Sequence, residues 1–186
     1  MNQVISIGKQ DFASLREGNY FFVDKTHFIS EWWESGDDIT LIARPRRFGK
    51  TLNMSMLNCF FSHQYAERAD LFEGLSVWEK EDYRAIQGKY PVIFLSFADV
   101  KQDNYRDAIY KIKKIIANVY QQFHEIGRSE ALTEVQRRQF MNVTADMDDV
   151  IAQSALQDLS YYCYLYYGRK AIILLDEYDT PMQEAY

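Results

Sequence analysis

Apolar residues along this chain fall into two kinds of pattern, which alternate from one end to the other. Nearly unbroken apolar runs at residues 39–43, 91–97 and 171–175 predict buried strands. Between these runs lie longer segments in which apolar side chains recur every three or four residues, the spacing of amphipathic helices. This alternation predicts an α/β fold with a mostly parallel sheet and helices on both faces.

Turn and capping residues set the expected limits of the helices. We predict helices from Thr26 to Gly36, from Lys50 to about Ser62, through residues 109–123 with a stop at Gly127, from about Ser129, and from about Asp146 to Gly168. The first 25 residues hold short apolar groups around glycines and predict small strands and turns. The helical stretch between the second and third strands is interpreted as an insertion within one domain.

The segment from Arg44 to Thr51 reads Arg-Pro-Arg-Arg-Phe-Gly-Lys-Thr and lies between a predicted strand and a predicted helix. This is the setting of a phosphate-binding P-loop, and Gly49-Lys50-Thr51 matches the end of the GxxxxGK[ST] pattern. Backbone N–H groups at the helix start can bind phosphate, Lys50 can reach it, and the Thr51 hydroxyl can bind Mg²⁺. Arg44 stands where the pattern has its first glycine. The predicted nucleotide-binding residues here are Arg46, Arg47, Phe48, Gly49, Lys50, Thr51 and Leu52.

The arginines of this segment have two interpretations. Arg46 and Arg47 carry guanidinium groups that suit bidentate contacts to phosphate, as does Arg44. Alternatively, some of them form salt bridges with carboxylates such as Asp24 or Asp179. We expect Arg46 or Arg47 to lie near the phosphates.

A second motif lies at the end of the last predicted strand, where the apolar run 171–175 leads into Asp176 and Glu177. A buried parallel strand that delivers acids to the carboxyl edge of a sheet is the Walker B arrangement. Asp176 would then bind the Mg²⁺ that Thr51 also binds, and Glu177 would be the catalytic residue that orients or deprotonates a water. The alternative is a core strand that ends in a solvated Asp-Glu pair.

Composition narrows the class of protein. The chain has 186 residues, of which 47% are hydrophobic, which is enough for a substantial core and one domain. A net charge of −6 argues against a general nucleic-acid surface. The two cysteines, Cys59 and Cys163, lack metal-ligand spacing, so we expect reduced thiols in a cytoplasmic protein. No apolar stretch has the length of a membrane span and no secretory signal is evident, so no membrane association is expected.

Four stretches of the chain together resemble the bacterial predicted AAA-ATPase-like family: residues 12–16, 20–26, 42–51 and 176–181. In that family the P-loop reads Arg-Pro-Arg-Arg-Phe-Gly-Lys-Ser/Thr, so Arg44 is a family trait. The resemblance implies a P-loop NTPase-like domain over residues 1–186 that binds ATP and Mg²⁺. It also implies that the segment before the P-loop strand, including Asp24 and Lys25, helps to form the base pocket.

The resemblance further implies that this sequence is the N-terminal portion of a longer pattern. The domain is expected to be incomplete after the Walker B strand, because the sensor strand and later arginine of such ATPases fall beyond residue 186. Hydrolysis is therefore expected to be weak, and any nucleic-acid contact would need the nuclease-like PD-(D/E)XK domain that often follows. Partners other than the nucleotide would be a second copy or another protein. The alternative function is a non-catalytic regulatory or protein-interaction module on a P-loop scaffold.

Overall fold

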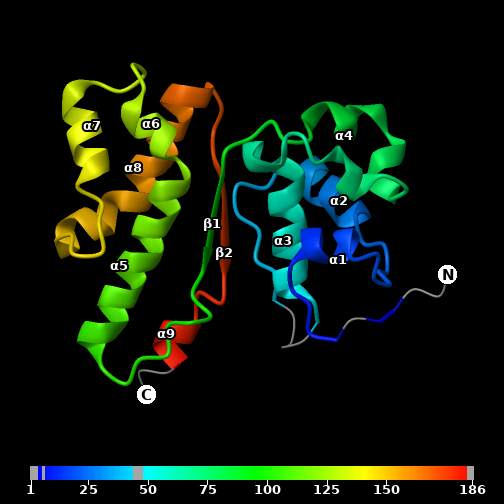
Figure 1. The fold of residues 1–186 in the computed structure, drawn as a ribbon, viewed down its shortest axis with the longest axis horizontal. Coiled ribbons are helices and arrows are strands. Elements are labelled where there is room, and N and C mark those ends of the chain that lie inside the picture. Colours follow the sequence, from blue (N-terminus) through cyan, green and yellow to red (C-terminus); the bar gives the residue numbers. More distant parts are fainter. Residues whose placement is uncertain (1–3, 6, 44–47, 184–186) are drawn as a thin grey trace. The chain divides into compact units, whose positions relative to one another are not determined.

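The computed structural model describes residues 4, 5, 7–43 and 48–183, with side chains as far as Pro181. The chain divides into two compact units, residues 1–90 and 91–186, and each is described by itself (Figure 1). Secondary structure is mostly helical, with a parallel sheet of two strands among the described residues. The expectation of a mixed α/β fold is confirmed, but the sheet is smaller than predicted.

In the first unit, the regular elements among the described residues are all helical. Its α-helices are α1 (Phe12–Glu17), α2 (His27–Ser35), α3 (Lys50–Phe61) and α4 (Glu81–Ile86), with 3-10 turns η1 (His63–Tyr65), η2 (Ala69–Phe72) and η3 (Ser76–Glu79). Aromatic rings form much of the interior. The rings of Phe12 and Phe72 stack at 5.2 Å, Phe60 meets Phe72 edge-on at 5.1 Å, and Trp33 stacks on Phe61 at 5.1 Å. Because two of these rings belong to the last turn of α3, that helix is firmly anchored at its C-terminal end.

Small strands and turns were predicted for the first 25 residues, but the described residues there form no strand and include helix α1. Asp11 caps the helix by accepting a hydrogen bond of 2.7 Å from the Ser14 N–H, and Phe12 and Leu15 are buried. The Phe12 N–H donates to the Ser55 hydroxyl on α3 at 2.9 Å, so a buried polar contact joins the two helices. A side-chain cap and a buried face thus favoured a helix over the predicted turns.

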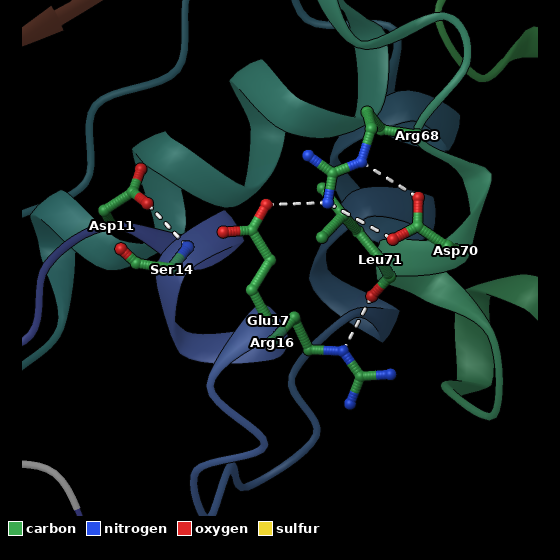
Figure 2. A network of polar contacts seen from close by, with 7 residues as sticks. All are labelled: Asp11, Ser14, Arg16, Glu17, Arg68, Asp70 and Leu71. Atoms are coloured by element: carbon green, nitrogen blue, oxygen red, sulfur yellow. Dashed lines mark hydrogen bonds and ion pairs between the residues drawn. The ribbon is translucent and has the colours of Figure 1, made fainter.

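A surface network also fastens α1 to the turn η2 (Figure 2). Arg68 pairs with Glu17 at 2.8 Å and with Asp70 at 3.0 Å, while Arg16 donates to the carbonyl oxygen of Leu71 at 2.8 Å. The hydrogen bond from Arg68 is the main cause that lowers the pKa of Asp70. Because these groups are largely exposed, water and salt screen the pairs, and each adds little to the stability of the unit.

Residues 39–43, predicted to be the first strand, do not form one in the structure. They have no regular secondary structure, and Ile39 and Leu41 are 91% and 68% exposed. A strand exists only when its N–H and C=O groups pair with a neighbour, and the described residues provide no strand beside this segment. The run is apolar as a strand would be, but the pairing that a strand requires is absent.

The second unit contains the sheet and most of the long helices. Its elements are β1 (Val92–Ser96), α5 (Tyr105–Gln122), α6 (His124–Arg128), α7 (Glu134–Met141), α8 (Asp149–Tyr167), β2 (Ile172–Asp176) and α9 (Thr180–Gln183). The two strands are parallel, with Val92 opposite Ile172 and Ser96 opposite Asp176. Both strands and their shared sheet were predicted from the apolar runs, and the structure confirms them.

Helices α5 to α8 all lie on one side of this sheet within the unit (Figure 1). Ile93 and Leu95 of β1 belong to the core that these helices form, and they are 0% and 1% exposed. By register, Ile173 and Leu175 of β2 share that face but remain 44% and 39% exposed. The helices therefore cover β1 more fully than β2, and the predicted helices on both faces are not found within this unit.

Two helix limits in the second unit differ from the prediction. Gly127 was expected to end a helix but lies inside α6. Glycine fits this position because a Cβ there would come within 2.6 Å of the Phe140 ring. The helix expected from about Ser129 begins at Glu134 instead, where Thr133 and Gln136 form a capping box. The helix α8 begins three residues after the expected Asp146 and ends at Gly168, in left-handed conformation as predicted.

Each unit holds one of the two cysteines in its interior. Cys59 and Cys163 are 1% and 0% exposed, and burial raises the pKa of both thiols to about 12. Both are free thiols, as expected from their spacing. In the part of the chain that the structure describes, no helix is long and apolar enough to cross a membrane.

Candidate functional site

The first half of the candidate site is the start of α3. Gly49 occupies the N-cap position with φ 78° and ψ 22°, a left-handed conformation that L-residues with side chains adopt only under strain. Among the described residues, no atom lies within 4 Å of a Cβ added to Gly49, so the preference for glycine here comes from the backbone conformation. The sequence pattern predicts a helix directly after this glycine, and the structure confirms it.

The first turn of α3 is arranged to accept an anion. Among the described residues no side chain caps this turn, and it contains no acidic residue. The N–H groups of a first helical turn have no partner within the helix, and the helix dipole favours negative charge there. Lys50, Thr51 and Leu52 are each partly exposed at this position. The predicted residues Gly49, Lys50, Thr51 and Leu52 therefore come together at one helix start that suits phosphate.

The residues just before this turn are only partly covered by the structure. Phe48 is 61% exposed. Arg46 and Arg47, together with Arg44, lie outside the described residues, so their predicted contacts to phosphate stay predictions.

The second half of the candidate site is the carboxyl end of β2. Asp176 is the last residue of the strand and is 4% exposed, and its carbonyl oxygen accepts a hydrogen bond of 3.0 Å from the Phe97 N–H. Glu177 follows with φ 52° and is half-buried. The strand therefore delivers two consecutive acids to its carboxyl end, as the sequence predicts, and the second acid has a strained backbone.

Thr180 contacts Glu177 through both backbone and side chain, and the sequence prediction missed it. The Thr180 N–H donates to the Glu177 carbonyl oxygen at 3.1 Å, and its hydroxyl donates to the carboxylate oxygen Oε2 at 3.3 Å. The side chain of Thr180 is buried, at 8% exposure. A signal was present, since Thr180-Pro181 is a typical helix start, but it does not reveal that the threonine turns back to Glu177.

A family model, described as "Predicted AAA-ATPase", matches residues 6–186, nearly the whole chain. The chain belongs to this predicted AAA-ATPase family. The resemblance drawn from the P-loop and the Asp-Glu strand is thereby confirmed. The match spans both units, so Gly49 and Asp176 fall within one family region.

One curated relative of this predicted AAA-ATPase comes from Azotobacter chroococcum mcd 1 and is named "Uncharacterized protein in vnfD 5'region". The two sequences are 30% identical over 179 residues, which cover 96% of this chain and 29% of the relative. The chain thus spans less than a third of that relative's length. No solved structure matches the chain significantly.

The predicted base-pocket residues lie in the segment before α2. Both carboxylate oxygens of Asp24 accept hydrogen bonds: Oδ1 from the Thr26 N–H at 2.8 Å, and Oδ2 from the Ser76 N–H at 2.7 Å. Partial burial raises the pKa of Asp24, but the hydrogen bonds from Thr26 and Ser76 outweigh it, so the pKa lies below its ordinary value. Lys25 is exposed. Asp24 thus joins α2 to η3, and a role for Asp24 and Lys25 at the base stays a prediction.

Thr26 was expected to cap α2 with its side chain, and this part of the prediction is wrong. Thr26 holds the N-cap position, but no side-chain cap bond is formed there. Its hydroxyl instead donates to Asp24 at 2.7 Å and accepts from the Val77 N–H at 3.1 Å. The fully buried Thr26 therefore ties two segments together, because its neighbours in space compete with the helix end for its oxygen.

The predicted ligands of Mg²⁺, Thr51 and Asp176, belong to different units. Thr51 lies in the first turn of α3, and Asp176 ends β2. Hydroxyl and carboxylate oxygens are the donors that Mg²⁺ prefers, so the two residue types fit the ion chemically. A single ion held by both residues stays a prediction.

Proposed function

We propose that this chain is the nucleotide-binding part of an ATPase that binds ATP with Mg²⁺. Membership of the predicted AAA-ATPase family supports this proposal. The observation that carries it is the start of α3, where a left-handed glycine opens an uncapped helical turn without acidic residues, followed at once by Lys50 and Thr51.

The phosphates are assigned to α3. The backbone N–H groups of the first turn would donate to phosphate oxygens, while the ammonium group of Lys50 would neutralise charge on the β- and γ-phosphates. Gly49 would let the phosphates approach the backbone closely, because it carries no side chain and takes the left-handed conformation without strain. Arg46 and Arg47 are assigned as further phosphate ligands.

Mg²⁺ is assigned to the Thr51 hydroxyl and the Asp176 carboxylate. The ion would neutralise charge that develops on the phosphates during transfer. Asp176 suits this role because it is a buried carboxylate at the end of a strand, where burial alone would disfavour its charge. A bound cation would compensate that charge.

Glu177 is assigned to the attacking water. Its carboxylate would accept a proton from the water as the oxygen bonds to the γ-phosphorus and the bond to the ADP leaving group breaks. The second candidate function is a switch, in which the chain binds nucleotide without hydrolysing it. It needs the same binding residues but not the proton transfer to Glu177. Binding and hydrolysis must therefore be measured separately.

Isothermal titration of the chain with ATP, ADP and GTP, each with and without Mg²⁺, tests the binding. We expect Mg²⁺-ATP to bind, and Lys50→Ala to weaken it about ten- to a hundredfold, because a charge-assisted contact contributes about 1.5–3 kcal/mol. The omission of Mg²⁺ should weaken ATP binding as well.

Lys89→Ala is the matched control, since Lys89 is an exposed lysine in the same unit. It should leave the affinity unchanged. Equal affinities of Lys50→Ala and the unmodified chain for Mg²⁺-ATP would overturn the proposal. Binding without phosphate release would favour the switch function instead.

A further inference from the structure

The turn after β2 contains a contact that the assignment of Glu177 alone does not explain. Glu177 has left-handed backbone, which reverses the chain sharply, and the Thr180 N–H closes this turn on the Glu177 carbonyl oxygen at 3.1 Å. Three residues after the glutamate, the chain thus returns to it. The turn brings the Thr180 side chain to the Glu177 side chain.

The side-chain contact is specific to one oxygen of the carboxylate. The Thr180 hydroxyl donates to Oε2 of Glu177 at 3.3 Å, and Thr180 is 8% exposed. Within the described residues no hydrogen bond engages the other oxygen, Oε1. A buried hydroxyl therefore holds one oxygen of a half-buried glutamate and leaves the second available to a water.

We propose that Thr180 is a positioning residue, whose hydroxyl fixes the Glu177 carboxylate in the orientation that activates water. This inference rests on the proposed ATPase function. A glutamate side chain has three rotatable bonds, and a base or water-orienting group must lie within hydrogen-bond reach of the water. The contact with Thr180 removes part of that freedom before substrate arrives.

A purely structural role for Thr180 makes different predictions. If the hydroxyl only stabilised the start of α9, its loss would lower stability and would alter binding and turnover together. A positioning role predicts a lower kcat with an unchanged KM, because the ground-state contacts to ATP lie elsewhere. It also predicts that serine, which keeps the hydroxyl, preserves the function.

Thr180→Val and Thr180→Ser test the inference, with Thr180→Ala as a second variant without the hydroxyl if the valine variant fails to fold. Thr144→Val is the matched control, because Thr144 is an exposed threonine of the same unit. In steady-state phosphate release with Mg²⁺-ATP, Thr180→Val should lower kcat about tenfold and leave KM unchanged, as expected for one lost hydrogen bond to a charged group. Thr180→Ser and Thr144→Val should match the unmodified chain.

A measurement without nucleotide makes the inference independent of turnover. The carboxyl carbon resonance of Glu177, identified by its loss in Glu177→Gln, is followed in the ligand-free chain labelled with carbon-13 at glutamate carboxyls. Thr180→Val should shift this resonance beyond its line width, while Thr180→Ser and Thr144→Val should leave it in place. An unmoved resonance in Thr180→Val, or an unchanged kcat in a chain that hydrolyses ATP, would overturn the positioning role.

The two proposals fail in different ways. If the unmodified chain does not bind Mg²⁺-ATP in the titration, the proposed function is wrong, whereas the ligand-free resonance still decides whether Thr180 holds Glu177. If the chain binds and hydrolyses ATP but Thr180→Val behaves like Thr144→Val, only the positioning role is wrong.

Discussion

Gly49 precedes α3 with a φ of 78°, and Glu177 follows β2 with a φ of 52°. Both residues mark the point where a regular element meets the turn that carries candidate chemistry. Glycine takes this left-handed conformation at no steric cost, whereas a residue with a side chain loses about 1–2 kcal/mol. The two halves of the candidate site therefore share a left-handed backbone conformation, which a glycine adopts in one half and a glutamate in the other.

The difference shows what each position supplies. At Gly49 the backbone itself is the useful group, so the absence of a side chain is an advantage. At Glu177 the side chain is retained in spite of the strain, although glycine would fit the turn better. Among the described residues the other non-glycine with positive φ is Asn19, a residue type that tolerates this conformation. A strained glutamate beside a buried aspartate is the kind of outlier that points to function.

The largest effect is expected from removing the negative charge of Glu177. Glu177→Gln keeps the shape of the side chain but cannot take a proton from water. We expect ATP hydrolysis to fall about 10²–10⁴-fold, the usual contribution of a general base, with Mg²⁺-ATP affinity retained. Phosphate release and titration calorimetry measure the two quantities. Hydrolysis at the original rate would assign Glu177 to the turn alone.

Asp24 contrasts with Glu177, because its carboxylate accepts hydrogen bonds that hold the fold together. We expect Asp24→Asn to lower the free energy of unfolding by about 1 kcal/mol or less, because the Ser76 N–H loses a charged acceptor but water screens this exposed contact. The lowered pKa of Asp24 means that this stabilisation is complete above the ordinary carboxyl pKa of 3.8 and is lost as the pH falls below it.

Denaturant unfolding of Asp24→Asn and of the unmodified chain, measured from about pH 3 to about pH 7, checks this expectation. The stability difference between Asp24→Asn and the unmodified chain should shrink at the acid end. A difference that is constant with pH would show that the charge of Asp24 is not what stabilises the contact.

Gly49→Ala tests the importance of the backbone at the start of α3, as Glu177→Gln tests that of the side chain after β2. Alanine in this left-handed position should destabilise the chain by about 1–2 kcal/mol and weaken Mg²⁺-ATP binding. Gly36→Ala is the matched control, because Gly36 has a φ of 64° at the end of α2. It should lower stability similarly and leave binding unchanged. Thermal unfolding and calorimetry of the pair separate the two effects.

The smallest effect is a gain in stability. Glu177→Gly relieves the strained backbone, so it should be more stable than Glu177→Ala by about 1 kcal/mol, since both variants lack the carboxylate. Chemical denaturation of the two variants gives the difference directly. If alanine is as stable as glycine at this position, the left-handed conformation is not a source of strain.

The elements that the sequence predicted well are those determined by local pattern. The apolar runs of β1 and β2, the periodicity of α3 and the glycine that ends α8 all lie within a few residues of the feature that they specify. The pattern from Gly49 to Thr51 was recognised for the same reason, and its role in phosphate binding stays a prediction. A fixed spacing of residue types carries that chemistry and needs no knowledge of distant contacts.

The errors arose where contacts between residues far apart in the sequence determine the local structure. Residues 39–43 have the composition of a strand, but a strand forms only beside a partner. Gly127 was read as a helix end, but it is a glycine inside α6 that leaves space for the distant Phe140 ring. The contact between Thr180 and Glu177 depends on a left-handed glutamate, which no residue preference would suggest. Local sequence patterns were therefore easier to predict than the contacts that support them.

The two buried thiols can report local unfolding of the chain, because each reacts only when its surroundings open. Because Cys59 lies in the first unit and Cys163 in the second, alkylation of each sulfur under native conditions records how often its own surroundings come apart. A thiol with a pKa of about 12 is almost wholly protonated at neutral pH, so the folded state itself should react very slowly. Mass spectrometry of the two cysteine peptides can thus follow the fluctuations of the first and the second unit separately, without any added label.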